Sequence, residues 1–259
     1  MSALSGLFLL AVGVSVGFLS GLLGIGGGIV MFPLLLYVPP ALGLPALDVK
    51  SVTGLTMAQG FFSALAALFY YHRNALVNKP LVLTLGLSLF LSSLAGALAS
   101  RGIQDSVLLM VFGTLALIAA VMMLIPRTYV HDELTEEKVV FHRGLAVAIG
   151  IVLGFSIGLV GQGGAFILIP VMLYVLKIPL RVALGSTLAV GLFSSSAGLV
   201  GKVATGQVPW LPALPLLAGA IPAARIGSIV GKKTKTAYLK WLLAALIAAT
   251  AIKVWISIL

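Results

Sequence analysis

Charged side chains, and acidic ones above all, are scarce in this chain of 259 residues, which has 16 Lys and Arg but only 6 Asp and Glu. Charged residues make up 8% of the sequence, against about a quarter in an average soluble domain. This shortage excludes a water-soluble globule. Seven stretches carry no charge at all: 1–47, 51–72, 80–100, 106–126, 144–176, 182–201 and 203–224. Each can cross about 30 Å of hydrocarbon as a helix, so the sequence predicts an all-α polytopic membrane protein.

Cysteine is absent, which excludes a disulfide framework, a thiolate nucleophile and a cysteine metal site. No predicted span contains a carboxylate, because Asp48 and Asp105 fall at span ends. Proton relays and cation sites within membranes normally need one, so cation transport is disfavoured. HExxH and GxSxG motifs are also missing. We therefore expect neither an enzyme nor a cofactor.

The net charge of +10 comes from basic residues spread singly among short connections. They are not gathered with aromatics on one face, as in nucleic-acid-binding proteins, and we interpret them as topology signals rather than as a nucleic-acid site. The first apolar run lacks a basic leader and continues to about Val38, so we expect it to be part of the mature protein.

An internal repeat divides the chain. The run Gly21-Leu-Leu-Gly-Ile-Gly-Gly-Gly28 with Pro33 reappears 137 residues later as Gly158-Leu-Val-Gly-Gln-Gly-Gly-Ala165 with Pro170. A second block matches at an offset of 131, where Lys50, Gly54, Thr56, Gly60, Phe62 and Ser63 correspond to Arg181, Gly185, Thr187, Gly191, Phe193 and Ser194. Two blocks in the same order indicate a duplication. The predicted halves are residues 1–126 and 144–259.

The segment 127–143 between the halves holds four of the six acids. It is predicted to be a solvated cytoplasmic linker. His131 and His142 lie in it, but no other ligands converge there at fixed spacing, so we expect a polar loop and no metal site.

Each half opens with an apolar stretch too long for one span, Ala3 to Val38 and Leu145 to Leu176. A helix of 36 residues would be roughly 54 Å long, so each stretch should fold back at its glycines as a helical hairpin. Three further spans follow in each half, near 52–71, 80–100 and 106–126, and near 182–201, 209–230 and 237–259. We expect eight to ten membrane segments.

The positive-inside rule selects between inverted and parallel halves. Inverted halves place 11 basic residues on one side, namely Arg73, Lys79, Arg127, Lys138, Arg143, Lys177, Arg181, Lys232, Lys233, Lys235 and Lys240, against Lys50, Arg101 and Lys202 on the other. Parallel halves give six against eight. The sequence thus predicts inverted repeats with both termini outside the cytoplasm.

The glycine-rich clusters at 24–28 and 161–165 precede a fresh helix that carries a proline, and they are predicted to unwind the backbone near mid-membrane. Such a break is tolerated only where it faces protein or a polar cavity. The N-terminus of the following helix offers N–H donors and a positive dipole end, which favour an anion. Two such termini in inverted repeats would face one central site. Gly13, Gly17, Gly86, Gly150 and Gly154 are interpreted instead as helix-packing residues.

The predicted substrate site combines the glycine turns with polar residues of the next span in each half. Its members are Gly24, Gly26, Gly27, Gly28, Thr56, Gln59, Gly161, Gln162, Gly163, Gly164, Ser186 and Thr187. For each hydroxyl, among them those of Thr53 and Ser194, a bond to its own helix carbonyl is the favoured alternative. For the two glutamines, ligand contact and interhelical hydrogen bonding are equally weighted.

The paired motifs Gly21-x-x-Gly-x-Gly-Gly-Gly28 with Pro33 and Gly158-x-x-Gly-x-Gly-Gly164 with Pro170, each followed by a basic residue and a Gly-x-Thr element, resemble the sulfite exporter TauE/SafE family over the full length. The resemblance implies an inner-membrane carrier of small sulfur-containing or organic anions. The second copy departs from it at Ala165, where the first has Gly28.

We therefore expect a transporter that exports sulfite or a related organosulfonate anion through a site between the repeats. Membrane potential drives an anion outward by about 2.3 kcal/mol per charge per 100 mV. The alternatives are an importer of a small organic sulfur compound or carboxylate, and a non-conducting membrane scaffold. The expected partners are the anion and the lipid bilayer. The oligomeric state is left open, a homodimer included.

Overall fold

The computed structural model describes residues 2–24, 26–71, 78–125, 141–161 and 165–258, which are helical and contain no strand. The helices of the first half are α1 (Ala3–Leu23), α2 (Gly28–Ala41), α3 (Val49–Tyr71), α4 (Lys79–Ala99), η2 (Ser100–Gly102) and α5 (Asp105–Leu124). Those of the second half are α6 (Arg143–Val160), α7 (Ala165–Tyr174), α8 (Leu180–Ala204), α9 (Trp210–Lys233) and α10 (Thr236–Ile258). Seven of these described helices are long and apolar enough to cross a membrane. The chain is a polytopic helical membrane protein.

Polar side chains fix where several helices begin. The Asn78 Oδ1 atom accepts a hydrogen bond from the Leu81 amide at 3.0 Å, and an Asp48 carboxylate oxygen accepts one from the Ser51 amide at 3.1 Å. His142, expected to be a plain loop residue, caps α6 by accepting from the Leu145 amide at 3.1 Å. Each bond satisfies an amide that has no partner within the helix.

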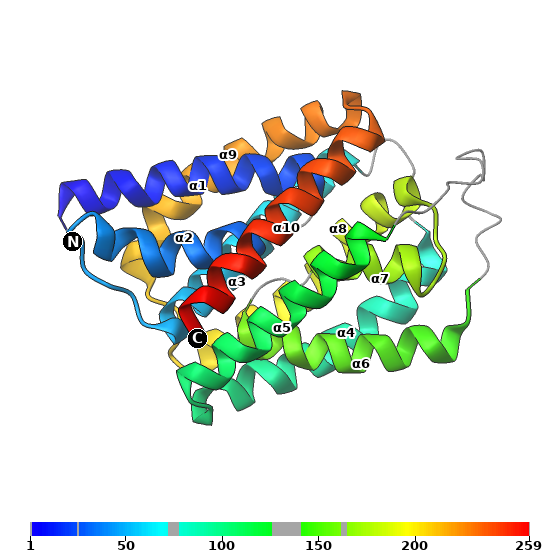
Figure 1. The fold of residues 1–259 in the computed structure, drawn as a ribbon, viewed down its shortest axis with the longest axis horizontal. Helices are drawn as coiled ribbons and strands as arrows, with labels where there is room; N and C mark the ends of the chain where they lie inside the picture. Colours follow the sequence, from blue (N-terminus) through cyan, green and yellow to red (C-terminus); the bar gives the residue numbers. More distant parts are fainter. Residues whose placement is uncertain (1, 25, 72–77, 126–140, 162–164, 259) are drawn as a thin grey trace.

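Both predicted hairpins form. Gly24 ends α1 and Gly161 ends α6, each in the left-handed conformation (φ of 69° and 73°) that favours glycine. In Figure 1, α1 begins and α2 ends toward the left end of the molecule, whereas α6 begins and α7 ends toward the right. Each hairpin therefore returns the chain to the end from which it came.

The turns lie deeper than the middle of the molecule. Gly24 packs against Leu184 and Leu188, in the first third of α8, and Gly161 packs against Thr53, in the first turns of α3. Helix α1 has 21 residues and is long enough, at about 31 Å, to cross the hydrocarbon by itself. The mid-membrane position of the turns stays a prediction.

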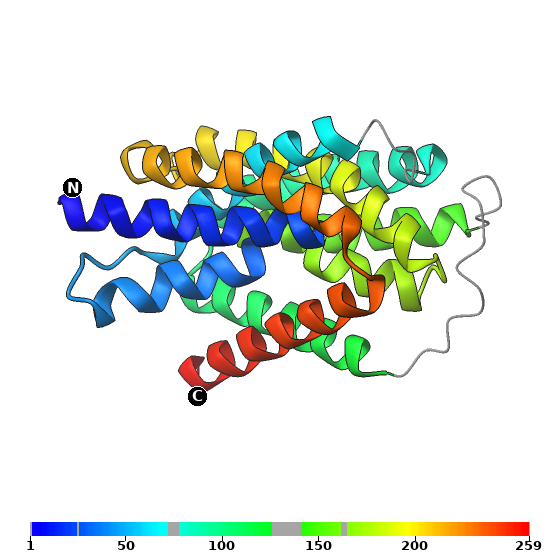
Figure 2. The ribbon, with the colours of Figure 1, turned by 90° about the horizontal axis from the view of Figure 1, so that it is seen from above.

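The packing partners exchange when the two halves are exchanged. Helix α1 packs on α9 and α6 on α4, while α9 packs on α3 and α4 on α8. Helices α3 and α8 pack on each other, and α5 packs on α10. Figure 2 shows this assembly from above, with α1 beside α9. Helices α3 and α8 thus bring residues of both halves to the interior.

The glycines interpreted as packing residues do pack. A Cβ atom at Gly13 or Gly17 would lie 2.1 or 2.4 Å from a backbone oxygen of α9. At Gly150 and Gly154 it would lie 1.9 and 2.0 Å from serine hydroxyls of α4, and at Gly86 it would lie 3.0 Å from the Phe193 ring. The packing interpretation is confirmed at Gly13, Gly17, Gly150 and Gly154, where a Cβ atom would clash, and Gly86 packs on the Phe193 ring.

Candidate functional site

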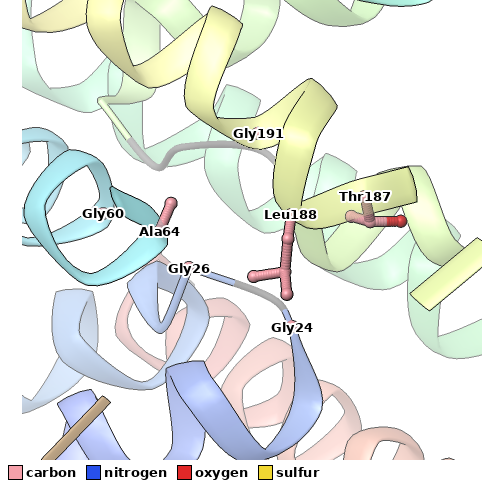
Figure 3. Close-up of a pocket in the computed structure, with 7 residues that line it drawn as sticks. All are labelled: Gly24, Gly26, Gly60, Ala64, Thr187, Leu188 and Gly191. Carbon is pink, nitrogen blue, oxygen red and sulfur yellow. The ribbon is translucent and has the colours of Figure 1, made fainter. Parts of the chain in front are cut away.

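A small cavity lies where the first hairpin meets α3 and α8. Its volume is about 10 Å³, which is room for about one water molecule. Figure 3 shows the residues around it, which come from the first hairpin and from both central helices. The lining residues are Gly24, Gly26, Gly60, Ala64, Thr187, Leu188 and Gly191. We call this space the glycine cavity; Gly60 and Gly191 are equivalent positions of the repeat.

Left-handed glycines shape the wall that the hairpin contributes. Gly26 and Gly27 have φ angles of 68° and 73°. Gly27 caps α2, whose first residue is Gly28, with no side-chain hydrogen bond. The first amides of a helix have no intrahelical acceptor, and they lie at the positive end of its dipole. The turn can therefore offer donors and partial positive charge to an anion without placing a side chain in its way.

Gln59 lies against this turn and is fully buried. Its Nε2 atom donates to the Ser63 hydroxyl at 2.9 Å, and a Cβ atom at Gly27 would lie 3.1 Å from that nitrogen. The Gln59 Oε1 atom has no hydrogen-bond partner among the described residues. Burial of an amide oxygen without a partner is costly, so Gln59 retains capacity for a further polar contact.

The second hairpin is also tied to α3. Thr56 donates through its hydroxyl to the Gly161 carbonyl at 2.6 Å, and a Cβ atom at Gly161 would lie 2.2 Å from the Thr53 carbonyl oxygen. Three predicted site residues, Gln162, Gly163 and Gly164, lie outside the described part of the chain. The structure thus brings Gly161 to α3, one helical turn or two from Gln59.

The Thr56 and Thr187 hydroxyls lie against carbonyls of their own helices, the alternative that the sequence analysis favoured. The Val52 and Thr53 carbonyl oxygens are each 2.9 Å from Thr56 Oγ1 and share its one hydrogen with the Gly161 carbonyl, and Thr187 donates to the Ala183 carbonyl. Figure 3 shows the Thr187 hydroxyl pointing away from the other lining residues. Ser186 accepts from the Asn78 amide at 3.2 Å and does not line the glycine cavity.

A buried cation, Lys202, was missed by the sequence analysis, which counted it among the loop charges. It lies in the last turn of α8 and is fully buried. Its ammonium group donates to Thr53 Oγ1 at 2.9 Å, Ser100 Oγ at 2.8 Å, Gln207 Oε1 at 2.9 Å and the Leu159 carbonyl at 3.1 Å. We call these residues the Lys202 cluster. Polar residues close to span ends, Thr53, Ser100 and Gln207, were the available signal.

Comparison with known proteins extends this picture. Residues 9–254 match the family model described as "Sulfite exporter TauE/SafE". The probable membrane transporter protein YunE of Bacillus subtilis is 24% identical over 90% of this chain and 91% of its own length. The probable membrane transporter protein MJ0441 of Methanocaldococcus jannaschii is 25% identical over 92% of this chain and 91% of its own length. A probable membrane transporter protein of Xylella fastidiosa is 30% identical over 84% of this chain and 82% of its own length. No solved structure gives a significant match.

Proposed function

The chain belongs to the sulfite exporter TauE/SafE family of membrane transporters, and from that premise we propose that it carries a small anion, sulfite or a related organosulfonate, outward across the inner membrane. The observation that carries the proposal is the glycine cavity, which both halves line and which a left-handed glycine turn borders. Such a turn exposes amide donors and no side chain.

The groups that border the cavity indicate the sign of the substrate's charge. Helix α2 begins at Gly28 beside it, so the positive end of that helix dipole faces this region. Among the lining residues there is no carboxylate. Amide donors and partial positive charge favour an anion, and no carboxylate among the lining residues offers a counter-charge to Na⁺, K⁺ or an amine.

Transport by inverted repeats is supported by the arrangement of the hairpins. The α1–α2 and α6–α7 hairpins enter from opposite ends of the molecule (Figure 1), and packing partners exchange with the halves. Repeats related in this way can form two conformations of one carrier that open to opposite sides. The cavity holds about one water molecule, whereas sulfite has four heavy atoms, so the anion requires the enclosing helices to separate.

The export direction rests on the membrane potential, which drives an anion out of a negative interior with no coupling ion. Import of a carboxylate or an organic sulfur compound would need such coupling. Two further features remain proposals: that both termini lie outside the cytoplasm, and that Gly163 and Gly164 complete a second half-site beside Gln162.

A matched pair of glycine variants tests the cavity. Gly26 and Gly43 both have φ of 68°, and a Cβ atom at either meets nothing within 4 Å. Alanine in the left-handed conformation costs about 1–2 kcal/mol at both positions. Only at Gly26 does the new methyl group enter the glycine cavity. We expect Gly26→Ala to lose most sulfite efflux from proteoliposomes, while Gly43→Ala keeps wild-type efflux.

The two variants should unfold at similar temperatures, because they carry the same backbone strain. Equal sulfite efflux by Gly26→Ala and Gly43→Ala would show that the substrate does not pass through the glycine cavity. Absence of efflux of sulfite, sulfoacetate and other organosulfonates by the wild-type protein would refute the proposed substrate class.

A further inference from the structure

The Lys202 cluster is the strongest concentration of buried polarity in the described part of the chain that the glycine cavity does not use. Lys202 is fully buried, and all four of its acceptors are neutral: two hydroxyls, one amide oxygen and one backbone carbonyl. Removal of an ammonium group from water is costly, and neutral acceptors offset less of that cost than a negative charge does. The cluster therefore lacks a counter-charge.

Other cations gather at the same end of the molecule. The Lys50 ammonium donates to the Arg101 carbonyl at 2.9 Å, one residue after Ser100 of the cluster. The two carboxylates of this end serve helix starts, since Asp48 caps α3 and Asp105 lies in the first turn of α5. Neither is a partner of Lys202. This end therefore holds three basic residues, Lys50, Arg101 and Lys202, against two carboxylates.

The cluster joins several elements at this end of the molecule. Lys202 lies at the end of α8, Thr53 at the start of α3, Ser100 in η2 and Leu159 in the last turn of α6. Gly161, which ends α6 and opens the second hairpin, packs directly on Thr53. When these elements separate, Lys202 loses its bonds to Thr53, Ser100 and Leu159, and its ammonium group keeps only the nearby Gln207.

We propose that the Lys202 cluster is a second anion subsite of the pathway, in which the ammonium group of Lys202 exchanges its neutral acceptors for a small oxyanion or sulfonate as this end opens. The inference rests on the proposed function. The subsite is distinct from the glycine cavity, because Lys202 follows Gly191 by eleven residues of α8, a length of about 16 Å. Its ligand supplies several acceptor oxygens to the ammonium group and to the Thr53 and Ser100 hydroxyls.

The repeat supports a role at one end only. At an offset of 131, Lys202, Thr53 and Ser100 correspond to Tyr71, Leu184 and Gly231. A cluster that served only to hold the fold together would be needed equally at both ends of the molecule. The equivalent positions of the repeat hold instead an aromatic, an aliphatic and a glycine residue.

Ligand-dependent thermal unfolding tests the subsite. Wild type, Lys202→Met, Lys202→Arg and the control Lys233→Met, which alters an exposed lysine at the end of α9, are titrated with sodium sulfite and with sodium chloride at equal ionic strength. A ligand that binds the folded state raises the unfolding temperature. We expect Lys202→Met to weaken the apparent sulfite affinity about tenfold or more, as for loss of a charged hydrogen bond. Lys202→Arg and Lys233→Met should stay close to wild type.

A purely structural lysine gives a different result. Lys202→Met would then unfold at a lower temperature without sulfite but bind sulfite with unchanged affinity, which overturns the subsite. If Lys202→Met does not fold, Lys202→Cys in this naturally cysteine-free chain is modified with aminoethyl or with methyl methanethiosulfonate. Recovery of sulfite binding by the positive adduct alone supports the subsite, and equal binding by both adducts refutes it. A wild-type protein that responds to no anion would instead refute the proposed function.

Discussion

At the scale of single residues, the buried polar side chains near the hairpins differ in whether their hydrogen-bonding groups have partners. The Thr56 and Thr187 hydroxyls donate to carbonyls of their own or neighbouring helices, so they stabilise the helices that border the turns. Gln59 differs because its Oε1 atom is buried without a partner among the described residues. It is therefore the side chain best placed to sense charge near the first hairpin.

Gln59→Glu should abolish anion binding with little change in side-chain shape. A carboxylate 4 Å from the anion costs about 4 kcal/mol at an effective dielectric constant of 20, which corresponds to a loss of affinity of about a thousandfold. Calorimetric titration of the purified variant with sulfite measures this loss. Gln104→Glu is the control, because Gln104 is exposed before α5. Binding by Gln59→Glu within about threefold of wild type would place the anion elsewhere.

At the scale of helices, glycine allows α1 to approach α9, and α6 to approach α4, closely. Gly13, Gly17 and Gly21 of α1 face α9, and Gly150, Gly154 and Gly158, their equivalents 137 residues later, face α4. Backbone approaches of this kind replace the hydrophobic driving force, which is absent between helices in lipid. The same residue type thus packs helices at some positions and breaks them at 24–27.

Gly17→Ala should destabilise the α1–α9 contact. Its Cβ atom would lie 2.4 Å from the Ala220 carbonyl oxygen and 2.6 Å from the Ala220 Cα atom, so the backbones must move apart. Overpacking of this kind costs about 1–3 kcal/mol. The loss of stability is measured as the fraction of protein that remains monodisperse after heating. Gly102→Ala, where a Cβ atom meets nothing within 4 Å, should behave as wild type.

The sequence was informative about elements because glycines and charges mark helix ends. The span expected near 80–100 is α4, Lys79–Ala99, and both hairpins break at the expected glycines. Burial of Lys202 was not predictable, because a lysine at the end of an apolar span reads as a topology signal. Its burial depends on Thr53 and Ser100, which are distant from it in sequence. The sequence could not show whether the hydroxyls of Ser186 and Thr187 contact a ligand, because their hydrogen-bond partners are visible only in the structure.

At the scale of the whole molecule, the two ends differ in chemistry. Lys50, Arg101 and the buried Lys202 gather near η2, whereas the sequence predicts eleven basic residues at the opposite end. The positive-inside rule predicts that the richer end faces the cytoplasm.

Single cysteines in the cysteine-free chain test this orientation. Lys79→Cys and Thr234→Cys should react with an impermeant maleimide only from the cytoplasmic side, and Gly102→Cys only from outside. Lys79 is used because it is exposed whereas the neighbouring Asn78 is buried. Reaction of the Lys79 and Thr234 variants from opposite sides of the membrane would contradict inverted repeats.

The small volume of the glycine cavity has a kinetic meaning. Under the proposed function, a cavity with room for about one water molecule gives the anion no continuous column of solvent through the bilayer. Each ion that crosses therefore waits for a collective displacement of helices, a process of microseconds to milliseconds. Throughput then saturates with concentration and rises steeply with temperature, and the cell's electrical gradient is not dissipated between turnovers.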